Sequence, residues 1–162
     1  MISPKMQNAY NEQIKEELFS AYLYMSMSAY FESLNLKGFA KWMSTQAQEE
    51  FTHAMKFYNH ILERGGKVEF QAIDKPKAEW NSPLNAFEEA YQHEQHITGC
   101  INKLAALAKD ENDLPSHTML HWFIDEQVEE EASTGEVAEK LKMIGDHPQG
   151  LFMMDSFMGK RE

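Results

Sequence analysis

Polar side chains that interrupt apolar helical faces are the most informative residues of this chain. Glu50 and His53 form a Glu-x-x-His pair, and residues three apart on a helix project from the same side. Three further segments each carry one carboxylate on their apolar face, at Glu17, Glu94 and Glu130. Carboxylate oxygens with one imidazole nitrogen suit a divalent transition metal such as iron. The spacing therefore predicts a metal site assembled from four helices.

These carboxylates need compensation if they point into the protein interior. A buried carboxylate is strongly unfavourable unless it is protonated, paired or bound to metal. The inward faces carry one imidazole and no Lys or Arg, so four glutamates cannot neutralise one another. A purely structural polar network is the alternative, and it is disfavoured because uncompensated carboxylates would destabilise the fold. We therefore expect bound metal.

Five stretches with helical apolar spacing must position these residues. A capping serine followed by proline marks two helix starts, at Ser3-Pro4 and Ser82-Pro83. The pair Gly65-Gly66 ends a helix as a C-cap. The expected helices cover residues 4–34, 36–64, 83–110, 114–144 and 148–158.

The connection over residues 65–82 decides the topology. Short links join the first helix to the second and the third to the fourth, so each pair is expected to form an antiparallel hairpin. A helix of about 28 residues is about 42 Å long, and an extended chain returns that distance in about 13 residues. We predict an all-α fold with a single domain over residues 1–162. It is a four-helix bundle with a long crossover between helices two and three and a short fifth C-terminal helix.

Composition excludes several classes of protein. The 162 residues are 43% hydrophobic and 25% charged, as in globular domains, and a net charge of −11 offers no basic surface for nucleic acid. No apolar run reaches the roughly 20 residues of a membrane span, and no secretory signal is evident. Cys100 is the only cysteine, which excludes an internal disulfide or a Cys-rich zinc site. We expect a cytoplasmic protein that binds neither nucleic acid nor membrane.

Together these residues resemble the bacterial non-haem ferritins, and the resemblance extends from Ser3 to the C-terminus. The stretches that carry it are Glu16-Glu17 with Tyr24, residues 48–54 (QEEFTHA), residues 63–66 (ERGG), Glu94 and residues 125–131 (DEQVEEE). Ferritin-like carboxylate proteins take single glutamates from two helices and Glu-x-x-His from the other two. This chain matches three helices of that scheme, and its fourth departs with Gln127-x-x-Glu130. The resemblance implies a ferritin-like four-helix bundle.

The resemblance also implies a dinuclear iron centre. Glu17, Glu50 and His53 would hold the first iron, and Glu50 would bridge to a second iron held by Glu94 and Glu130.

Further residues are implied around that centre. Gln127 would lie beside the second iron, and Tyr24 would supply an electron or a hydrogen bond. A third iron site would use Glu49, Glu126 and Glu129 together with Glu130.

One departure separates this chain from relatives that bind haem. Bacterioferritins carry a haem-ligating Met directly after the second-helix glutamate, where this chain has Phe51. They also carry Glu-x-x-His on the fourth helix. We therefore expect no haem.

The activity implied by the resemblance is iron storage with ferroxidase activity. Fe(II) would be oxidised by dioxygen or peroxide at the dinuclear centre, and Fe(III) oxyhydroxide would be stored as a mineral. One chain encloses no cavity, so storage requires a homo-oligomeric shell, which the resemblance places at two dozen copies.

The apolar residues also favour assembly. The first helix carries a second apolar stripe, made of Phe19, Leu23, Met27 and Tyr30. We expect that the core of one bundle cannot bury both stripes of this helix. The fifth helix is apolar nearly all round, with Leu151, Phe152, Met153, Met154, Phe157 and Met158. A short helix of this kind needs partners, either its own bundle or other subunits.

Two other classes of function remain open. One is a dinuclear oxygenase or peroxidase with an organic substrate, which would need an access pocket beside the metals. The other is a non-catalytic interaction module, which would leave the inward carboxylates unexplained. The third-site glutamates have an alternative as solvated helix charges, and Tyr24 as a core aromatic. Four histidines, His93, His96, His117 and His121, project away from the site, and we expect the first two at the surface.

Overall fold

The computed structural model describes residues 1–161, so residue 162 of the predicted domain lies outside it. Its elements are α1 (Pro4–Ser33), α2 (Lys37–Glu63), α3 (Pro83–Asp110), α4 (Leu114–Ile144) and α5 (Pro148–Met158). Each helix begins and ends within one residue of the range expected from the sequence. Residues 1–161 contain no strand, and the predicted all-α class is confirmed. Over the same residues, no helix combines the length and apolarity needed to cross a membrane.

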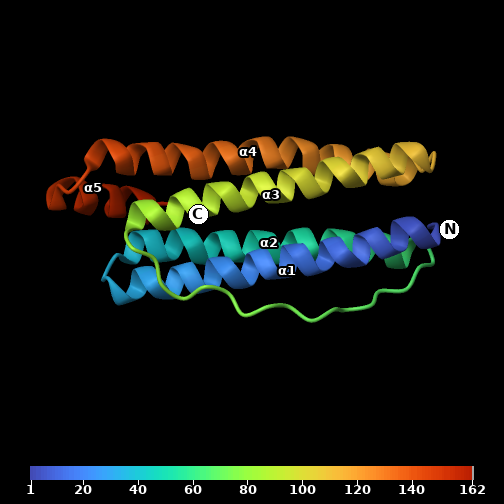
Figure 1. Cartoon of the computed structure of the whole chain (residues 1–162), viewed down its shortest axis with the longest axis horizontal. Helices are drawn as coiled ribbons and strands as arrows, with labels where there is room; N and C mark the ends of the chain where they lie inside the picture. The colour runs from blue at the N-terminus through green and yellow to red at the C-terminus, as the bar shows by residue number, and fades with distance from the viewer. Residues whose placement is uncertain (162) are drawn as a thin grey trace.

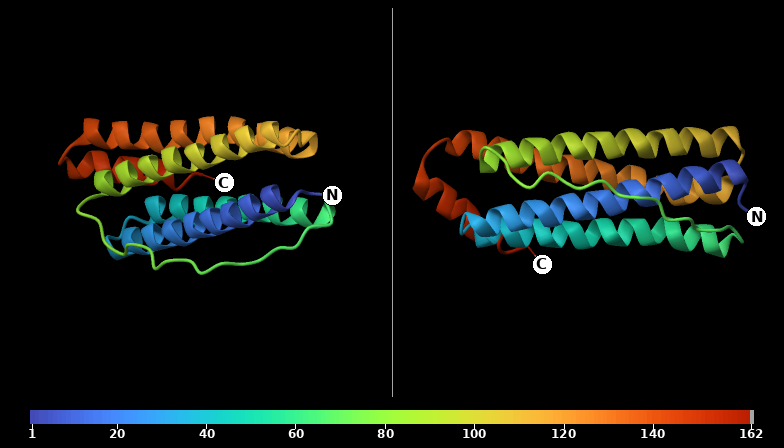
Figure 2. Two further views of the ribbon diagram at one scale, coloured as in Figure 1. Left: turned by 45° about the vertical axis from the view of Figure 1, so that its right-hand side comes forward. Right: turned by 60° about the horizontal axis from the view of Figure 1, so that its bottom comes forward.

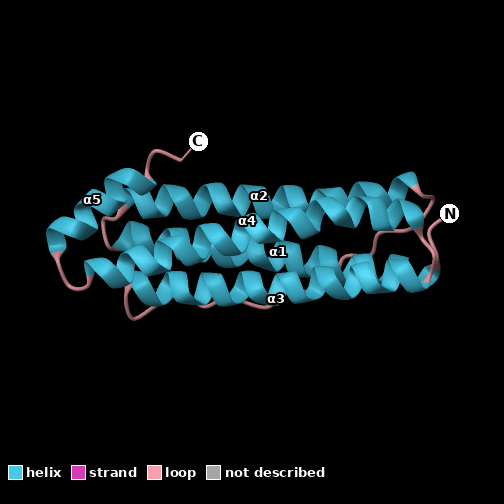
Figure 3. Ribbon diagram, turned by 90° about the horizontal axis from the view of Figure 1, so that it is seen from above, coloured by secondary structure: helices cyan, strands magenta, loops and turns pink. Residues whose placement is uncertain are grey.

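Two antiparallel hairpins make up the bundle. The α1–α2 pair lies against the α3–α4 pair, and α5 packs at one end, against α2 and α4 (Figures 1 and 3). The segment between α2 and α3 runs along the flank of the bundle from one end to the other (Figure 2). The crossover predicted from helix length is therefore present.

Serine side chains cap the first turns of α1 and α3. The Ser3 hydroxyl accepts from the Met6 amide at 3.2 Å, and the Ser82 hydroxyl accepts from the Asn85 amide at 3.0 Å. Each cap is followed by proline in the first turn, where the missing amide hydrogen costs nothing. At the end of α2, Gly65 takes a φ of 71°, which only glycine adopts readily.

Hydrogen bonds to α1 and α3 hold the crossover in place. The buried Asn11 side chain donates to the Lys67 carbonyl at 3.2 Å and accepts from the Glu69 amide at 3.0 Å. Farther along, the Trp80 indole is buried and donates to Glu89 of α3 at 2.8 Å. Hydrogen bonds with side chains of α1 and α3 therefore hold this long segment, which has no secondary structure of its own.

The bundle has two apolar cores with a polar layer between them. Near the α5 end, one core is built around the stacked rings of Phe31 and Phe39. At the opposite end, the other is built around the stacked rings of Phe57 and Phe123. Each of the four long helices contributes to both cores, and the candidate metal ligands lie in the stretch between. The apolar ends thus support a polar middle.

The second apolar stripe of α1 is mostly buried within this single chain. Met27 is fully buried and Leu23 nearly so, both in the core near α5. Tyr30 is partly covered by Trp80 of the crossover, with ring centroids 5.3 Å apart. The expectation that one bundle cannot bury both stripes was wrong, because the crossover supplies an extra covering layer.

Helix α5 buries only part of its apolar surface. Met154 and Met158 are buried against the bundle. Three other side chains of α5 are largely exposed: Phe152 (70%), Met153 (76%) and Phe157 (57%). The helix therefore packs on its own bundle and still presents an apolar face to a partner.

A contact between α5 and the start of α2 depends on glycine. The residue before α2, Leu36, provides no side-chain cap, and the Phe39 amide instead donates to the Asp155 carboxylate of α5 at 3.0 Å. A Cβ added at Gly38 would lie 1.7 Å from the Asp155 carbonyl oxygen. Only glycine lets α5 approach close enough to cap α2.

We expect Gly38→Ala to destabilise the protein by about 1–3 kcal/mol, because the new methyl group must push α5 away. Gly99→Ala is the matched control, since Gly99 lies inside α3 with open space where its Cβ would be. Alanine there should stabilise by roughly 0.5–1 kcal/mol through helix propensity. Calorimetric unfolding of the two variants checks this. Equal melting temperatures would contradict the packing argument.

Candidate metal centre

Five buried side chains from four helices meet in the polar layer. Glu17 of α1, Glu50 of α2 and Glu94 of α3 are each 1% exposed, and His53 and Glu130 are nearly as buried. They form two sets of three residues, and within each set one ligand atom per residue lies within 4.8 Å of the other two. The first set is Glu17, Glu50 and His53, and the second is Glu50, Glu94 and Glu130. Glu50 belongs to both. The residues grouped by sequence reasoning are thus brought together in space.

The Glu-x-x-His pair is oriented by its own helix. Nδ1 of His53 lies 3.0 Å from Oε2 of Glu50, one turn away on α2. The His53 ring also packs edge-on against Phe123 of the neighbouring apolar core. Spacing along one helix therefore aims both groups at the same point.

Two buried glutamines that sequence reasoning did not assign to the site supply hydrogen bonds to the carboxylates. Gln13 donates to Glu17 at 2.9 Å. Gln46 donates to Glu50 at 3.0 Å and across the bundle to Glu130 at 2.6 Å. Each glutamine lies four residues before the glutamate on its own helix, so this spacing was the signal in the sequence.

Tyr24 and Gln127 both contact Glu94. The buried Tyr24 hydroxyl donates to one carboxylate oxygen, and the Gln127 amide donates to the other at 3.2 Å. Tyr24 therefore does more than fill the core, because its hydroxyl is aimed at a candidate ligand.

Desolvation dominates the electrostatics of the carboxylates. Burial, reinforced by the charge of Glu50, raises the pKa of Glu17 well above its usual range. The same two causes raise the pKa of Glu94 and of Glu130 to about 8. Burial and the nearby Glu94 charge also raise the Tyr24 pKa. Charged glutamates are thus unfavourable here without a cation.

Two further observations fit a bound cation. Burial lowers the His53 pKa, but the hydrogen bond and charge of Glu50 outweigh this, so the pKa lies above its ordinary value. Within residues 1–161, Oε2 of Glu17 is buried and has no hydrogen-bond partner. An orphaned carboxylate oxygen beside an imidazole is the donor arrangement that a divalent metal satisfies.

The candidate third-site residues are less closely gathered. Glu126 approaches the centre, with its Oε1 3.7 Å from Nε2 of His53. Glu129 is exposed, and Glu49 forms an ion pair with Arg161, which no sequence pattern had linked to the site. Arg161 also donates to Gln46 at 2.9 Å, so the C-terminal segment touches the hydrogen-bond network of the centre.

The two histidines beside Glu94 differ in how exposed their side chains are. His96 has a 56% exposed side chain, as expected. His93 was expected at the surface and is instead half-buried, with Nε2 2.7 Å from the Ser20 hydroxyl and its ring edge-on to Tyr24. Burial lowers its pKa to about 4. The surface prediction for His93 was wrong because α1 covers this side of α3.

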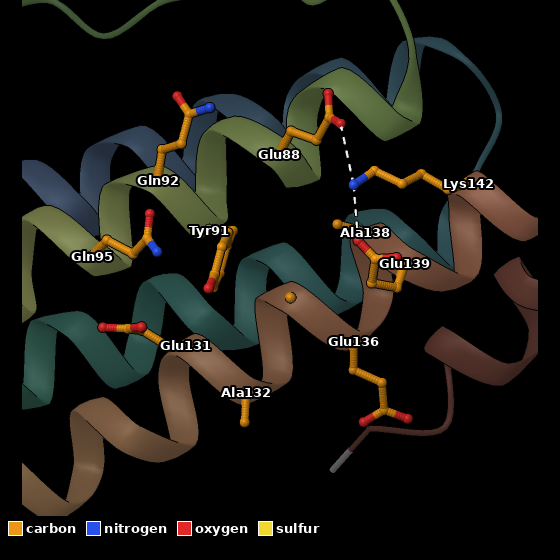
Figure 4. A pocket seen from close by; sticks show the side chains of 11 residues that line it. Glu88, Tyr91, Gln92, Gln95, Glu131, Ala132, Glu136, Ala138, Glu139 and Lys142 are labelled. Atoms are coloured by element: carbon orange, nitrogen blue, oxygen red, sulfur yellow. Dashed lines mark hydrogen bonds and ion pairs between the residues drawn. The ribbon is translucent and has the colours of Figure 1, made fainter.

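A large hollow of about 520 Å³ lies away from the centre, between α3 and α4 (Figure 4). Its wall includes Tyr91, which packs over Gly135, and Lys142, which pairs with Glu139 at 2.8 Å and Glu88 at 3.8 Å. None of the five buried candidate ligands lines this hollow. It is therefore not an entrance to the candidate metal centre.

Comparison with known proteins gives concordant matches. A family model described as a ferritin-like domain matches residues 7–144. A bacterial non-heme ferritin of Bacteroides fragilis is 43% identical over 161 residues, covering 99% of this chain and 100% of that protein. A Staphylococcus aureus protein of the same name is 37% identical, with coverage of 99% and 97%. The crystal structure of an open pore ferritin from Archaeoglobus fulgidus superposes with a TM-score of 0.98 at 46% identity, covering 100% and 99%.

The raised carboxylate pKa values predict how metal-free protein responds to pH. A group whose folded pKa exceeds its unfolded value stabilises the fold below the unfolded pKa, and that stabilisation is lost as pH rises through the folded pKa. For Glu94 and Glu130 the window runs from 4.5 to about 8. The melting temperature of metal-free protein should fall by roughly 5 °C or more between about pH 6 and pH 9.

The matched control is Glu94→Gln with Glu130→Gln, which imitates the protonated side chains. Calorimetry of this double variant should show a flatter dependence over the same range. A melting temperature of the wild-type apo-protein that rises with pH would contradict the assignment.

Proposed function

This chain belongs to the ferritin family, as its sequence predicted, and from that premise we propose that it is an iron-storage protein with ferroxidase activity. Its substrates are Fe(II) and dioxygen or peroxide. Oxidation takes place inside the bundle of each subunit, at Glu17, Glu50, His53, Glu94 and Glu130. The Fe(III) product is stored as an oxyhydroxide mineral.

One observation carries this proposal: Glu50 belongs to both sets of converging ligand atoms. A carboxylate with one oxygen toward each set can bridge two metal ions. Glu17 and His53 complete the first ligand set, and Glu94 and Glu130 complete the second. The proposal assigns one iron to each set, and the buried position keeps both away from bulk water.

The protein residues prepare the site for two divalent ions. Protons held by Glu94 and Glu130 near neutral pH leave as Fe(II) binds, because a metal and a proton compete for the same oxygens. Gln13 and Gln46 hold the carboxylates in orientation. Two Fe(II) ions then give one electron each to dioxygen, which takes up two protons and becomes hydrogen peroxide.

Tyr24 and Gln127 act on the second ligand set through Glu94. Both donate hydrogen bonds to its carboxylate, which fixes the direction of the remaining lone pairs. In the proposed reaction, Gln127 lies beside the second iron and Tyr24 supplies a hydrogen bond or an electron. The second set contains no imidazole, which favours release of the oxidised product toward storage.

A third iron site is proposed at Glu49, Glu126 and Glu129, together with Glu130. Glu126 supports it through its closeness to His53 and Glu130. Arg161 pairs with Glu49, so the arginine must release this carboxylate before a metal can use it. The third site would therefore fill after the first two.

Storage requires an assembly, and we propose a homo-oligomeric shell of two dozen subunits in the cytoplasm. The exposed apolar face of α5 supports association, since Phe152, Met153 and Phe157 are open to solvent in the single chain. No haem is proposed, because Phe51 stands where haem-binding relatives place methionine.

The competing function, an oxygenase or peroxidase with an organic substrate, has less support. Such an enzyme needs room for substrate beside the metals. The hollow in Figure 4 is instead lined by other residues of α3 and α4, none of them among the five buried candidate ligands. Oxygen uptake driven by Fe(II) alone, without an organic substrate, separates the two functions.

Glu50→Ala should abolish the fast initial oxidation of Fe(II), because it removes the one ligand shared by both irons. His53→Ala should slow oxidation less, since it removes only one ligand of the first iron. Without metal, Glu50→Ala should be neutral or stabilising, because repulsion among buried carboxylates is relieved. Stopped-flow mixing of apo-protein with Fe(II) in aerated buffer measures the rates. A wild-type burst in Glu50→Ala would refute the dinuclear assignment.

Glu49→Ala combined with Glu129→Ala should spare the first oxidation burst and change the oxygen-to-iron ratio or later turnovers. The reason is that these glutamates lie beside the centre without joining either ligand set. Glu136→Ala combined with Glu139→Ala, two exposed changes on α4, is the charge-matched control. Oxygen-electrode and stopped-flow measurements decide, and loss of the first burst would place the pair in the main centre.

A further inference from the structure

A second cluster of potential ligands lies at the seam between α1 and α3, which run side by side (Figure 3). His96 and Cys100 are four residues apart on α3 and project from one face, with Sγ of Cys100 3.7 Å from Nε2 of His96. Glu16 reaches across from α1, placing Oε2 2.9 Å from the same nitrogen. One ligand atom from each of the three lies within 4.8 Å of the other two.

This cluster is separate from the buried carboxylates. Glu16 precedes Glu17 in sequence, but neighbouring helical residues point about 100° apart, so the two glutamates face different surroundings. The side chains of Glu16 and His96 are 29% and 56% exposed, whereas Glu17 is 1% exposed. Cys100 is half-buried. A cation could reach this cluster directly from solvent.

We propose that Glu16, His96 and Cys100 form a second metal-binding site, for a borderline-soft divalent cation of the Zn(II) or Co(II) type. A thiolate, an imidazole and a carboxylate are the three donor types that such ions take from proteins. Three protein ligands leave a fourth tetrahedral position for water. The buried centre differs in kind, because it offers mainly carboxylate oxygens.

The spacing of the donor atoms agrees with tetrahedral coordination. Metal–sulfur and metal–nitrogen bonds of about 2.3 and 2.1 Å put those two atoms about 3.6 Å apart around a tetrahedral ion. The separation of 3.7 Å between Cys100 and His96 is close to this value. Glu16 must move back by about half an ångström from its hydrogen-bonded position, to an oxygen–nitrogen separation of about 3.4 Å. That movement accompanies replacement of a shared proton by the metal.

Two simpler roles, a redox-sensing thiol and a surface ion pair, do not explain why all three side chains converge. A redox-sensing thiol usually has a lowered pKa, whereas burial and the Glu16 charge raise the pKa of Cys100. An exposed ion pair between Glu16 and His96 would add little stability and would not involve the cysteine. Metal binding uses all three side chains. It would also tie together the two hairpins, since α1 and α3 belong to different ones.

The test uses the fact that Cys100 is the only cysteine of the chain. Any thiolate-to-cobalt charge-transfer absorption must therefore report this site, even if Co(II) also occupies the buried centre. Metal-free assembled protein is titrated anaerobically with Co(II), in the presence of a phosphine reductant that keeps the thiol reduced. At saturation, its intensity should correspond to one thiolate-bound cobalt per chain.

Variants distinguish a site made of three ligands from metal binding by the thiol alone. Cys100→Ser should abolish the band, and His96→Ala and Glu16→Gln should each weaken cobalt binding by roughly tenfold or more, since each removes a direct ligand. His121→Ala is the matched control, an exposed histidine on α4 paired with His117, and should leave the titration unchanged. Glu50→Ala should also retain the band, because it disrupts only the buried centre.

Three results would overturn the proposal. The first is absence of a thiolate band in the wild-type protein. The second is unchanged cobalt affinity in both His96→Ala and Glu16→Gln, which would mean that a lone thiol binds adventitiously. The third is loss of the band in Glu50→Ala, which would make the cluster part of the buried centre. Iron oxidation is measured separately, so failure here leaves the proposed ferroxidase function intact.

Discussion

Desolvation of carboxylates in the middle of the bundle is the constraint on which the rest of this structure depends. Glu17, Glu50 and Glu94 are almost completely removed from water, and no buried Lys or Arg lies among them in residues 1–161. Such groups persist only if protons, amide donors or metal ions compensate them. Raised pKa values and the Gln13 and Gln46 hydrogen bonds compensate part of this cost. A pair of divalent ions would compensate the remainder.

The two apolar cores stabilise the bundle on either side of the layer of buried carboxylates, and so offset the cost of burying them. Stacked aromatic rings on either side, Phe31 with Phe39 and Phe57 with Phe123, contribute packing energy that the polar layer does not. Because each long helix is anchored at both ends, its middle turn is held in place without needing favourable contacts of its own. The packing that supports the fold and the candidate metal ligands are thus separated along the helix axis.

The closing elements of the chain link the ends of the bundle to its centre. Asp155 of α5 caps the start of α2, the helix that carries Glu50 and His53. Beyond α5, Arg161 reaches back to Gln46 and Glu49 at the edge of the polar layer. Hydrogen bonds and charge therefore link the C-terminal segment to the candidate metal centre. Sequence patterns linked α5 only to assembly, but α5 also supports α2, the helix that carries Glu50 and His53.

Local sequence patterns were enough to predict the helices, the crossover and the five buried candidate ligands. Helical period, serine–proline caps and the length of the segment over residues 65–82 are local properties, and a carboxylate on an apolar face is visible without coordinates. What covers each helix face depends on how the helices and the crossover pack together. Tyr30 is partly covered because Trp80 of the crossover packs against it, and His93 is half-buried because Ser20 and Tyr24 lie against it. The meeting of Glu16 with His96 was equally invisible, since residues far apart in sequence become neighbours only when two helices pack.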